Sequence, residues 1–181
     1  IDIGIPPTAL DAPDAVHEND PDLWLSSLPR PRIDGHKYDR GHAVVASGDA
    51  FCCGASRLAA RAALRAGSGL VSAVGPADAM TLHAAYTAAV LTEVCETAEA
   101  FDSLLGQRRR NAVLLGPGNG VSDLTRANVG AALRRKLPCV LDADALTAFE
   151  ERPAALFAAI DGPCVLTPHD GEFARLFGPL A

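Results

Sequence analysis

Short apolar runs alternate with segments of helical spacing from Gly41 to the end of the chain, and this alternation restricts the fold most. The six apolar runs are residues 42–47, 70–74, 90–94, 111–115, 138–141 and 164–166. Segments with helical spacing are residues 55–67, 77–89, 96–107, 122–136, 153–160 and 167–177. Strands that alternate with helices over short connections are typical of βαβ units. We therefore predict an α/β layered fold with a mostly parallel sheet.

The helix expected over residues 55–67 is predicted to pack through Leu58, Ala62 and Leu64 and to end at Gly67. Ser122 is a good N-cap for the helix over residues 122–136. The chain is 49% hydrophobic but only 5% aromatic, so the core must consist mainly of Ala, Val and Leu. Such a core suits helices that lie close against a sheet.

The first 35 residues differ from the rest of the chain. Residues 1–6 alternate as a strand stub would, and residues 6–35 are rich in Pro, Asp and Gly, with one short helix expected around residues 23–28. A strand stub followed by a linker suggests the tail of another domain.

The charge and the cysteines exclude several classes of protein. A net charge of −6 argues against nucleic acid as a partner, because phosphate contacts need clustered Lys and Arg; the basic run 108–110 is interpreted as a solvated helix end. No apolar run reaches the eighteen residues of a membrane span, so no membrane partner is expected. The odd number of cysteines, without a CxxC pair, indicates reduced thiols and a cytoplasmic protein.

Four loops that follow predicted strands carry glycine or polar residues. They are "GDAFCCGA" from Gly48, "GPGNG" from Gly116, "DADAL" from Asp142 and "TPHDGE" from Thr167. Ligands of parallel α/β sheets lie beyond the carboxyl ends of the strands. The four loops therefore predict one site along that edge of the sheet.

Each loop also has a plain structural interpretation. "GDAFCCGA" is no P-loop, because Ala55 stands where a Lys is needed; it is either a turn that presents N–H groups to a polar ligand or a tight strand-to-helix turn. "GPGNG" does not match a dinucleotide fingerprint, since Val121 replaces the last glycine. Its glycines at 116, 118 and 120 allow a ligand close to the backbone, or simply a turn.

The two loops with acidic residues can likewise be interpreted as parts of a ligand site or as helix caps. Asp142 and Asp144 suit a Mg²⁺-bound nucleotide or a sugar hydroxyl, or they cap a helical turn. In "TPHDGE", Thr167 is predicted as N-cap and Pro168 as first helical residue. Capping by Thr167 leaves His169 unexplained, so we predict that His169 belongs to the site.

Taken together, four segments resemble one family. They are "HKYDRGHAVVASGDAFCCGASRLAARAALRAGSGLVSAVGP", "NAVLLGPGNG", "PCVLDADAL" and "CVLTPHDGEFARLFG". They resemble, in the same order, the ADP/ATP-dependent NAD(P)H-hydrate dehydratase domain, the C-terminal domain of the bifunctional NAD(P)H-hydrate repair enzymes, formerly described as carbohydrate kinases. The resemblance implies a ribokinase-like α/β/α sandwich and a metabolite-repair lyase. The expected reaction dehydrates hydrated NAD(P)H at the expense of ADP or ATP with Mg²⁺, and nucleotide substrates are the expected partners.

The resemblance also assigns residues. Positions that match the family's substrate site are Ala55, Gly118 and His169; positions expected near the nucleotide are Gly116, Gly120, Asp142 and Asp144. His36 and Lys37 match the family's "HK" pair before the first strand, as structural or substrate-facing residues. Metal ligands are not assigned.

The family's lysine-bearing strand and its Gly-Thr-Gly-Asp loop, whose aspartate is the expected base, do not occur before Ala181. No catalytic residue is therefore assigned, and the chain by itself is expected to be inactive. We expect residues 1–16 to be the tail of a preceding epimerase-like domain with its linker, and residues 17–181 to be the N-terminal two-thirds of the dehydratase domain. The sheet is then incomplete at its C-terminal end, and its open edge predicts a homo-oligomer.

Two other functions stay open at this point. One is a small-molecule kinase of the same fold, acting on a sugar or a vitamin alcohol. The other is a truncated, non-catalytic paralogue that serves as a binding module.

Overall fold

The computed structural model describes residues 18–178. From Gly35 onward the chain forms one compact unit, separate from the segment that ends at Asp34. That segment contains α1 (Pro21–Trp24), which starts earlier than expected because Asp20 caps it by accepting a hydrogen bond from the Asp22 N–H. The strand stub expected at residues 1–6 and the domain boundary expected between residues 16 and 17 lie outside the described residues and stay predictions.

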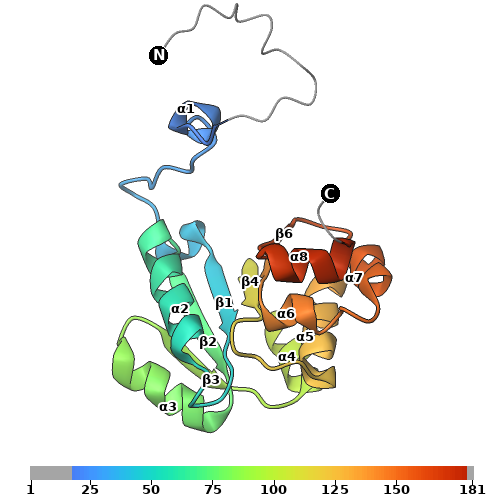
Figure 1. Cartoon of the computed structure of the whole chain (residues 1–181). Helices are drawn as coiled ribbons and strands as arrows, with labels where there is room; N and C mark the ends of the chain where they lie inside the picture. Colours follow the sequence, from blue (N-terminus) through green and yellow to red (C-terminus); the bar gives the residue numbers. More distant parts are fainter. Residues whose placement is uncertain (1–17, 179–181) are drawn as a thin grey trace, which may run out of the picture. The chain divides into compact units, whose positions relative to one another are not determined.

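The compact unit alternates strands and helices as the sequence predicts (Figure 1). The strands are β1 (His42–Ala46), β2 (Leu70–Gly75), β3 (Leu91–Val94), β4 (Ala112–Leu115), β5 (Cys139–Leu141) and β6 (Cys164–Leu166). The helices are η2 (Lys37–Arg40), α2 (Gly54–Ala66), α3 (Ala77–Tyr86), α4 (Ala98–Leu105), α5 (Asp123–Arg134), α6 (Asp144–Thr147), α7 (Pro153–Ala159) and α8 (Asp170–Phe177).

All six strands pair in parallel, in the order β3-β2-β1-β4-β5-β6. The chain first builds outward from β1 to β3 and then returns to place β4 on the other side of β1. Between β1 and β4 the direction of winding therefore reverses. In sheets of this kind ligands bind beyond the strands' carboxyl ends at such a reversal.

Helices cover both faces of the sheet, which confirms the predicted layered fold. On one face, Val45 and Val71 pack with Met80 of α3 and with the alanines of α2. On the other face, Val44 and Val74 belong to a larger core that α4 to α8 complete. Val44 and Val45 are both fully buried although they point to opposite faces, which is why β1 is a continuous apolar run rather than an alternating one.

The packed face of α2 differs from the predicted one. Leu58 is 64% exposed and Ala62 is exposed, whereas Ala60 is buried and Ala59 packs beside it. Small residues allow the helix to lie close to the strands, so the alanine face meets the sheet and Leu58 points outward. Of the predicted face, Leu64 alone packs against the core.

The start of α8 also differs from the prediction. Thr167 does not cap the helix, because its N–H continues the strand pairing by donating to the Leu141 carbonyl at 3.2 Å. The N-cap is His169, whose Nδ1 accepts the N–H groups of Gly171 at 3.0 Å and Glu172 at 3.4 Å. Glu172 completes a capping box by accepting from the His169 N–H at 3.0 Å.

A second histidine, His36, uses the same arrangement at the opposite end of the sheet. Its Nδ1 accepts from Tyr38 N, and Asp39 accepts from the His36 N–H at 2.7 Å, so that η2 is capped. The η2 turn lies against Gly69, where an added Cβ would come within 1.6 Å of the Lys37 carbonyl oxygen. His36 and Lys37 therefore serve the fold at the amino end of β2, away from the loops predicted to form the site.

A buried polar network begins at the amino end of β1 and crosses the sheet to β3. His42 Nε2 is 2.9 Å from Ser72 Oγ, and that hydroxyl donates to Glu93 Oε1 at 2.9 Å. Arg110 Nη2 bridges both Glu93 oxygens at 2.7 and 2.8 Å. Burial and the Arg110 charge lower the pKa of His42, so this histidine is neutral at pH 7.

Candidate functional site

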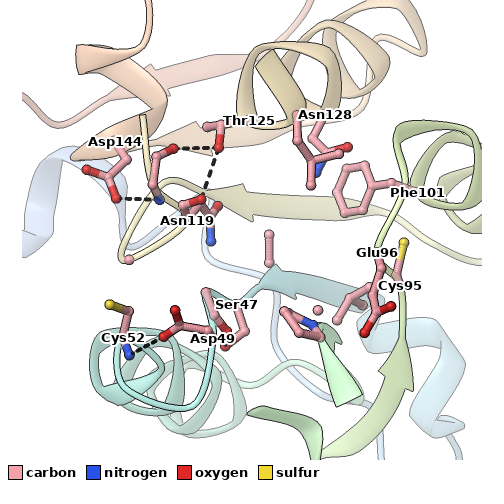
Figure 2. A pocket seen from close by; sticks show the side chains of 18 residues that line it. Ser47, Asp49, Cys52, Cys95, Glu96, Phe101, Asn119, Thr125, Asn128 and Asp144 are labelled. Atoms are coloured by element: carbon pink, nitrogen blue, oxygen red, sulfur yellow. Dashed lines mark hydrogen bonds between the residues drawn. The ribbon is translucent and has the colours of Figure 1, made fainter. Parts of the chain in front are cut away.

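A cavity of about 500 Å³ lies at the carboxyl ends of β1, β2 and β4, where the winding of the sheet reverses. Its walls come from the loops after β1, β3 and β4, from α4 and α5, and from the start of α6. Figure 2 shows Asp49 and Cys52 on one side, facing Asn119, Thr125 and Asp144 on the other. A volume of this size suits a small organic ligand.

The loop after β1 is shaped by Asp49. One oxygen of its carboxylate, Oδ1, accepts the N–H groups of Phe51 at 2.9 Å and Cys52 at 3.0 Å. This carboxylate also raises the pKa of the Cys52 thiol, which keeps the thiol protonated. Phe51 is 97% exposed at the tip of the loop.

Glycines in two of the four loops allow three of the loops to pack backbone against backbone. A Cβ on Gly48 would come within 1.7 Å of the Gly118 carbonyl oxygen, and one on Gly118 within 2.2 Å of the Cys52 carbonyl oxygen. A Cβ on Gly116 would come within 1.7 Å of the Asp142 carbonyl oxygen. These close approaches are made to neighbouring loops, so the glycine pattern reflects the assembly of the site as well as any ligand.

Side chains fix the "GPGNG" loop from within. Asn119 Oδ1 accepts from the Gly116 N–H, and Asp144 Oδ2 accepts from the Gly120 N–H, both at 2.8 Å. Thr125 Oγ1 reaches the Gly120 carbonyl at 2.6 Å. Because the N–H groups of Gly116 and Gly120 already have partners, they do not form a phosphate cradle.

The charged groups of the cavity are all acidic. Asp49, Glu96 and Asp144 line it together with apolar side chains such as Phe101, and no Lys, Arg or His of residues 18–178 is among the lining residues. An acidic lining disfavours an anion. The cavity therefore suits a neutral or cationic group of a ligand.

Two amides of the lining have buried atoms without a hydrogen-bond partner among the described residues, Asn119 Nδ2 and Asn128 Oδ1. The orientation of Asn119 is fixed because its Oδ1 holds the Gly116 N–H, so Nδ2 is the free donor. In Figure 2 this nitrogen points toward the cavity. A buried donor of this kind favours a ligand with a hydrogen-bond acceptor.

Of the seven residues assigned from the sequence, the cavity brings three together and leaves four outside its lining. Those that line it are Gly118, Gly120 and Asp144; the others are Ala55, Gly116, Asp142 and His169. Ala55 lies exposed in the first turn of α2, where Cys53 provides no side-chain cap. Gly116 and Asp142 meet each other behind the lining.

His169 lies at the end of β6, two strands away from β4 in the sheet. Its side chain is 68% exposed, with Nε2 at 3.5 Å from Glu172 Oε1. Capping thus accounts for this residue, contrary to the reasoning from the sequence. Contact of His169 with a substrate stays a prediction.

Sequence reasoning missed several lining residues. Asp49 stood inside a motif already singled out, so its position was a usable signal. Thr125 and Asn128 are ordinary polar positions of an amphipathic helix in the sequence. Only the packing of α5 beside β4 turns them toward the cavity.

Metal binding has little support in residues 18–178, because no group of three or more His, Cys, Asp or Glu side chains lies close enough there to hold an ion. None of the helices in that part of the chain is long and apolar enough to cross a bilayer. All five cysteines are free thiols, as expected.

Comparison with known proteins points to one family. The sequence pattern of the NAD(P)H-hydrate dehydratase family matches residues 43–181. A bifunctional NAD(P)H-hydrate repair enzyme of Moorella thermoacetica is 39% identical over 165 residues, which cover 86% of this chain and 31% of that enzyme. The corresponding enzyme of Mycobacterium tuberculosis is 38% identical over 151 residues, covering 83% of this chain and 29% of the relative. The chain thus spans about a third of the length of the curated relatives it matches.

A solved structure has the same fold. It is the ADP/ATP-dependent NAD(P)H-hydrate dehydratase of Bacillus subtilis co-crystallised with ATP and Mg²⁺, at a TM-score of 0.68 and 27% identity. The match covers 84% of this chain and 53% of the other. A ribokinase-like protein of Enterococcus faecalis, at 19% identity and a TM-score of 0.67, agrees in fold. The ribokinase-like fold predicted from the sequence is thereby confirmed.

Proposed function

The chain belongs to the NAD(P)H-hydrate dehydratase family, and on that premise we propose that its cavity receives the hydrated nicotinamide ring of NAD(P)H hydrate. The protein that carries the chain then acts as a nucleotide-dependent dehydratase that restores NAD(P)H. The observation that supports this best is the chemistry of the cavity. It is acid-lined, receives no basic side chain from the part of the chain that the structure describes, and lies at the winding reversal. A hydrated, reduced nicotinamide ring is uncharged, so it fits this lining better than a phosphate does.

The reaction needs a better leaving group at C6 of the ring, because hydroxide is expelled poorly. Transfer of a phosphoryl group from ADP or ATP to the C6 hydroxyl would supply one. The lone pair of the ring nitrogen then expels phosphate, and loss of the C5 proton restores the double bond. The residues of this chain would hold the ring and exclude water from it.

The nucleotide phosphates fit the described residues poorly. Asp144 is engaged with the Gly120 N–H, the cavity has no basic residue, and Asp142 lies outside the lining. We therefore assign residues 18–178 to the substrate half of the site, and we derive no step from them for Mg²⁺ or the nucleotide. Roles for Ala55, Gly118 and His169 toward the substrate, and for Gly116, Gly120, Asp142 and Asp144 toward the nucleotide, stay predictions.

The test is an activity measurement on the whole protein that carries this chain. NADH hydrate is incubated with Mg²⁺ and either ADP or ATP, and recovery of the reduced-nicotinamide absorbance band is followed. Recovery that depends on the nucleotide is the expected result. Omission of the nucleotide is the matched control.

A folded protein that gives no recovery with either nucleotide would overturn the proposal. Phosphorylation of a sugar or vitamin alcohol by the same protein would then favour the kinase. The chain by itself, assayed in parallel, is expected to give no recovery, because the described residues provide no site for the phosphates.

Two further expectations belong to the proposal. The free cysteines agree with a cytoplasmic location.

The edge strand β6 leaves Val165 56% exposed, and an open apolar edge invites pairing, which supports a homo-oligomer. Sedimentation velocity of the chain by itself, in which β6 is an edge strand, tests the second point, and a monomer at micromolar concentration would refute it.

A further inference from the structure

A buried triangle of polar side chains lies at the wall of the cavity, where its member Ser47 belongs to the lining, and neither the family resemblance nor the proposed function accounts for it. His83 Nε2 is 3.1 Å from Ser47 Oγ and 3.2 Å from Ser56 Oγ, and the two hydroxyl oxygens are 2.9 Å apart. All three residues are buried. His83 belongs to α3, Ser47 follows β1 directly and Ser56 lies in the first turn of α2.

The carbonyl oxygens beside the triangle favour one assignment of its donors. Ser47 Oγ also contacts the Gly48 carbonyl at 3.0 Å, and Ser56 Oγ the Cys53 carbonyl at 2.8 Å. Carbonyl oxygens only accept, and two serines have only two hydroxyl protons. With both hydroxyl protons directed to these carbonyls, the contacts of His83 with the two serines need the Nε2–H of His83, and the contact between the two hydroxyl oxygens at 2.9 Å has no proton of its own. Burial and the charge of Arg57 lower the pKa of His83, which favours a neutral ring, and a neutral ring that donates to the serines carries its single proton on Nε2.

The two serines bracket the loop that forms one wall of the cavity. Between them lie Gly48 to Ala55, which include the lining residues Asp49 and Cys52. The same loop touches "GPGNG" backbone to backbone at Gly48 and Gly118. Because the two loops are in direct backbone contact, a shift of either end of the loop between Ser47 and Ser56 changes the shape of the cavity.

We propose that His83 is a positioning residue of the site: by donating from Nε2 to Ser47 and Ser56 it holds both ends of the loop between β1 and α2 in the register that the cavity requires. It touches no substrate and acts only through the loop. The kinetic test of this inference rests on the proposed function, but the hydrogen-bond network can also be tested by a measurement that needs no enzyme activity.

The kinetic test compares His83→Met with His83→Gln in the whole protein. Met fills a similar volume without a donor, whereas Gln returns an N–H near the position of Nε2. We expect Met to raise KM for NADH hydrate about tenfold while kcat changes less than about threefold, since the loop holds substrate rather than reacting with it. Gln should bring KM back to within about threefold of wild type.

The matched control is the other buried histidine. His42 also contacts a serine hydroxyl and also has a lowered pKa, but it lies at the amino end of β1. His42→Met should lower the unfolding temperature as His83→Met does and leave KM unchanged. An unchanged KM in His83→Met, an equal rise in His83→Gln, or an equal rise in His42→Met would each overturn the proposal.

A second measurement needs neither a stable variant nor an active enzyme. Long-range ¹H–¹⁵N NMR of the histidine rings in the wild-type protein should show His83 as the Nε2–H tautomer, with a slowly exchanging proton. A proton on Nδ1 would overturn the proposal. If the tautomer is as expected and the wild type fails to restore NADH, the proposed function fails while the positioning network stands.

Discussion

The two ends of the parallel sheet contain similar buried polar groups but use them differently. From the amino end of β1, His42 contacts Ser72, which donates to Glu93, and Arg110 pairs with Glu93, so this network links three strands and the residue pair before β4. At the carboxyl end, His83, Ser47 and Ser56 connect to the carbonyls of a loop beside a cavity of about 500 Å³. The same residue types thus stabilise the fold at one end and shape a site at the other. Position in the sheet, more than residue type, separates a structural network from a functional one.

The largest expected effect separates two glycines, one at each end. Gly118→Ala should lower kcat/KM for NADH hydrate by about 100-fold or more. The added Cβ would come within 2.2 Å of the Cys52 carbonyl oxygen, and the φ of +73° is unfavourable for alanine. The loop must then move, and small displacements of the groups that hold a substrate lower the rate strongly. Gly69→Ala meets the Lys37 carbonyl oxygen at 1.6 Å and should lower the unfolding temperature with little change in KM. Gly120→Ala, at φ +77° but with no atom within 4 Å, is the control for backbone strain alone. If kcat/KM of Gly118→Ala is no lower than that of Gly120→Ala, the close contact at Gly118 does not shape the site, and the contrast between the two ends of the sheet fails.

The next effect concerns stability at the amino end. Arg110 is buried and Glu93 partly so, and removal of one member of such a pair leaves a charge poorly solvated. Arg110→Met should reduce the free energy of unfolding by about 2 kcal/mol, below the range for fully buried pairs because Glu93 retains some solvent. Urea denaturation measures this loss, and KM of the folded variant should stay within about twofold of wild type. A rise in KM would mean that the two ends are coupled.

A smaller effect tests the free donor in the cavity. Asn119→Asp keeps the oxygen that accepts from the Gly116 N–H but replaces Nδ2 with an acceptor beside three other carboxylates. Affinity for NADH hydrate, whose uncharged ring carries hydrogen-bond acceptors, should fall about tenfold, as expected when a buried polar contact becomes unfavourable. Asn111→Asp is the matched control, because Asn111 Oδ1 likewise accepts a backbone N–H, that of His42, at the other end of the sheet. Titration calorimetry that finds the two variants alike would exclude this role for Asn119.

The smallest effect is on pH dependence. Both buried histidines have a pKa below the ordinary value of 6.5, so below that pH the unfolded chain binds protons that the folded protein does not. Their contribution to stability is complete above about pH 6.5 and is lost as the pH falls toward the lowered values. The free energy of unfolding, measured from pH 7.5 to 5, should decline on acidification. The His42→Gln and His83→Gln variants should each show a shallower decline, and slopes equal to wild type would contradict the assignment.

Much of the fold was predictable because it depends on local periodicity. The six strands and the Ser122 cap of α5 lie where the sequence placed them, since apolar runs and caps act over a few residues. Errors arose where tertiary packing chose between local options. The backbone of Thr167 pairs with the Leu141 carbonyl, which leaves capping to His169, and the alanine face of α2 displaces Leu58 from the core.

The site was predictable in outline and less so in detail. Loops after strands pointed to the correct edge, and Gly118, Gly120 and Asp144 do line the cavity. Asn119 stood inside a recognised motif, but its free donor appears only once Gly116 has bound its oxygen. His83 had no signal in the sequence, because a histidine within a helix gives no sign of the serines that it meets across the fold.

The sequence by itself determined the alternation of strands and helices, the glycine loops that follow the strands, and the resemblance to the dehydratase family. These depend on residues that are near one another in the chain. Only the tertiary structure decided which face of α2 is buried, which histidine caps α8, and which polar side chains meet at the wall of the cavity. Those outcomes depend on contacts between distant segments, such as Ser47 with His83 or Gly48 with Gly118, and a close-packed interior allows only the arrangement in which all of them fit.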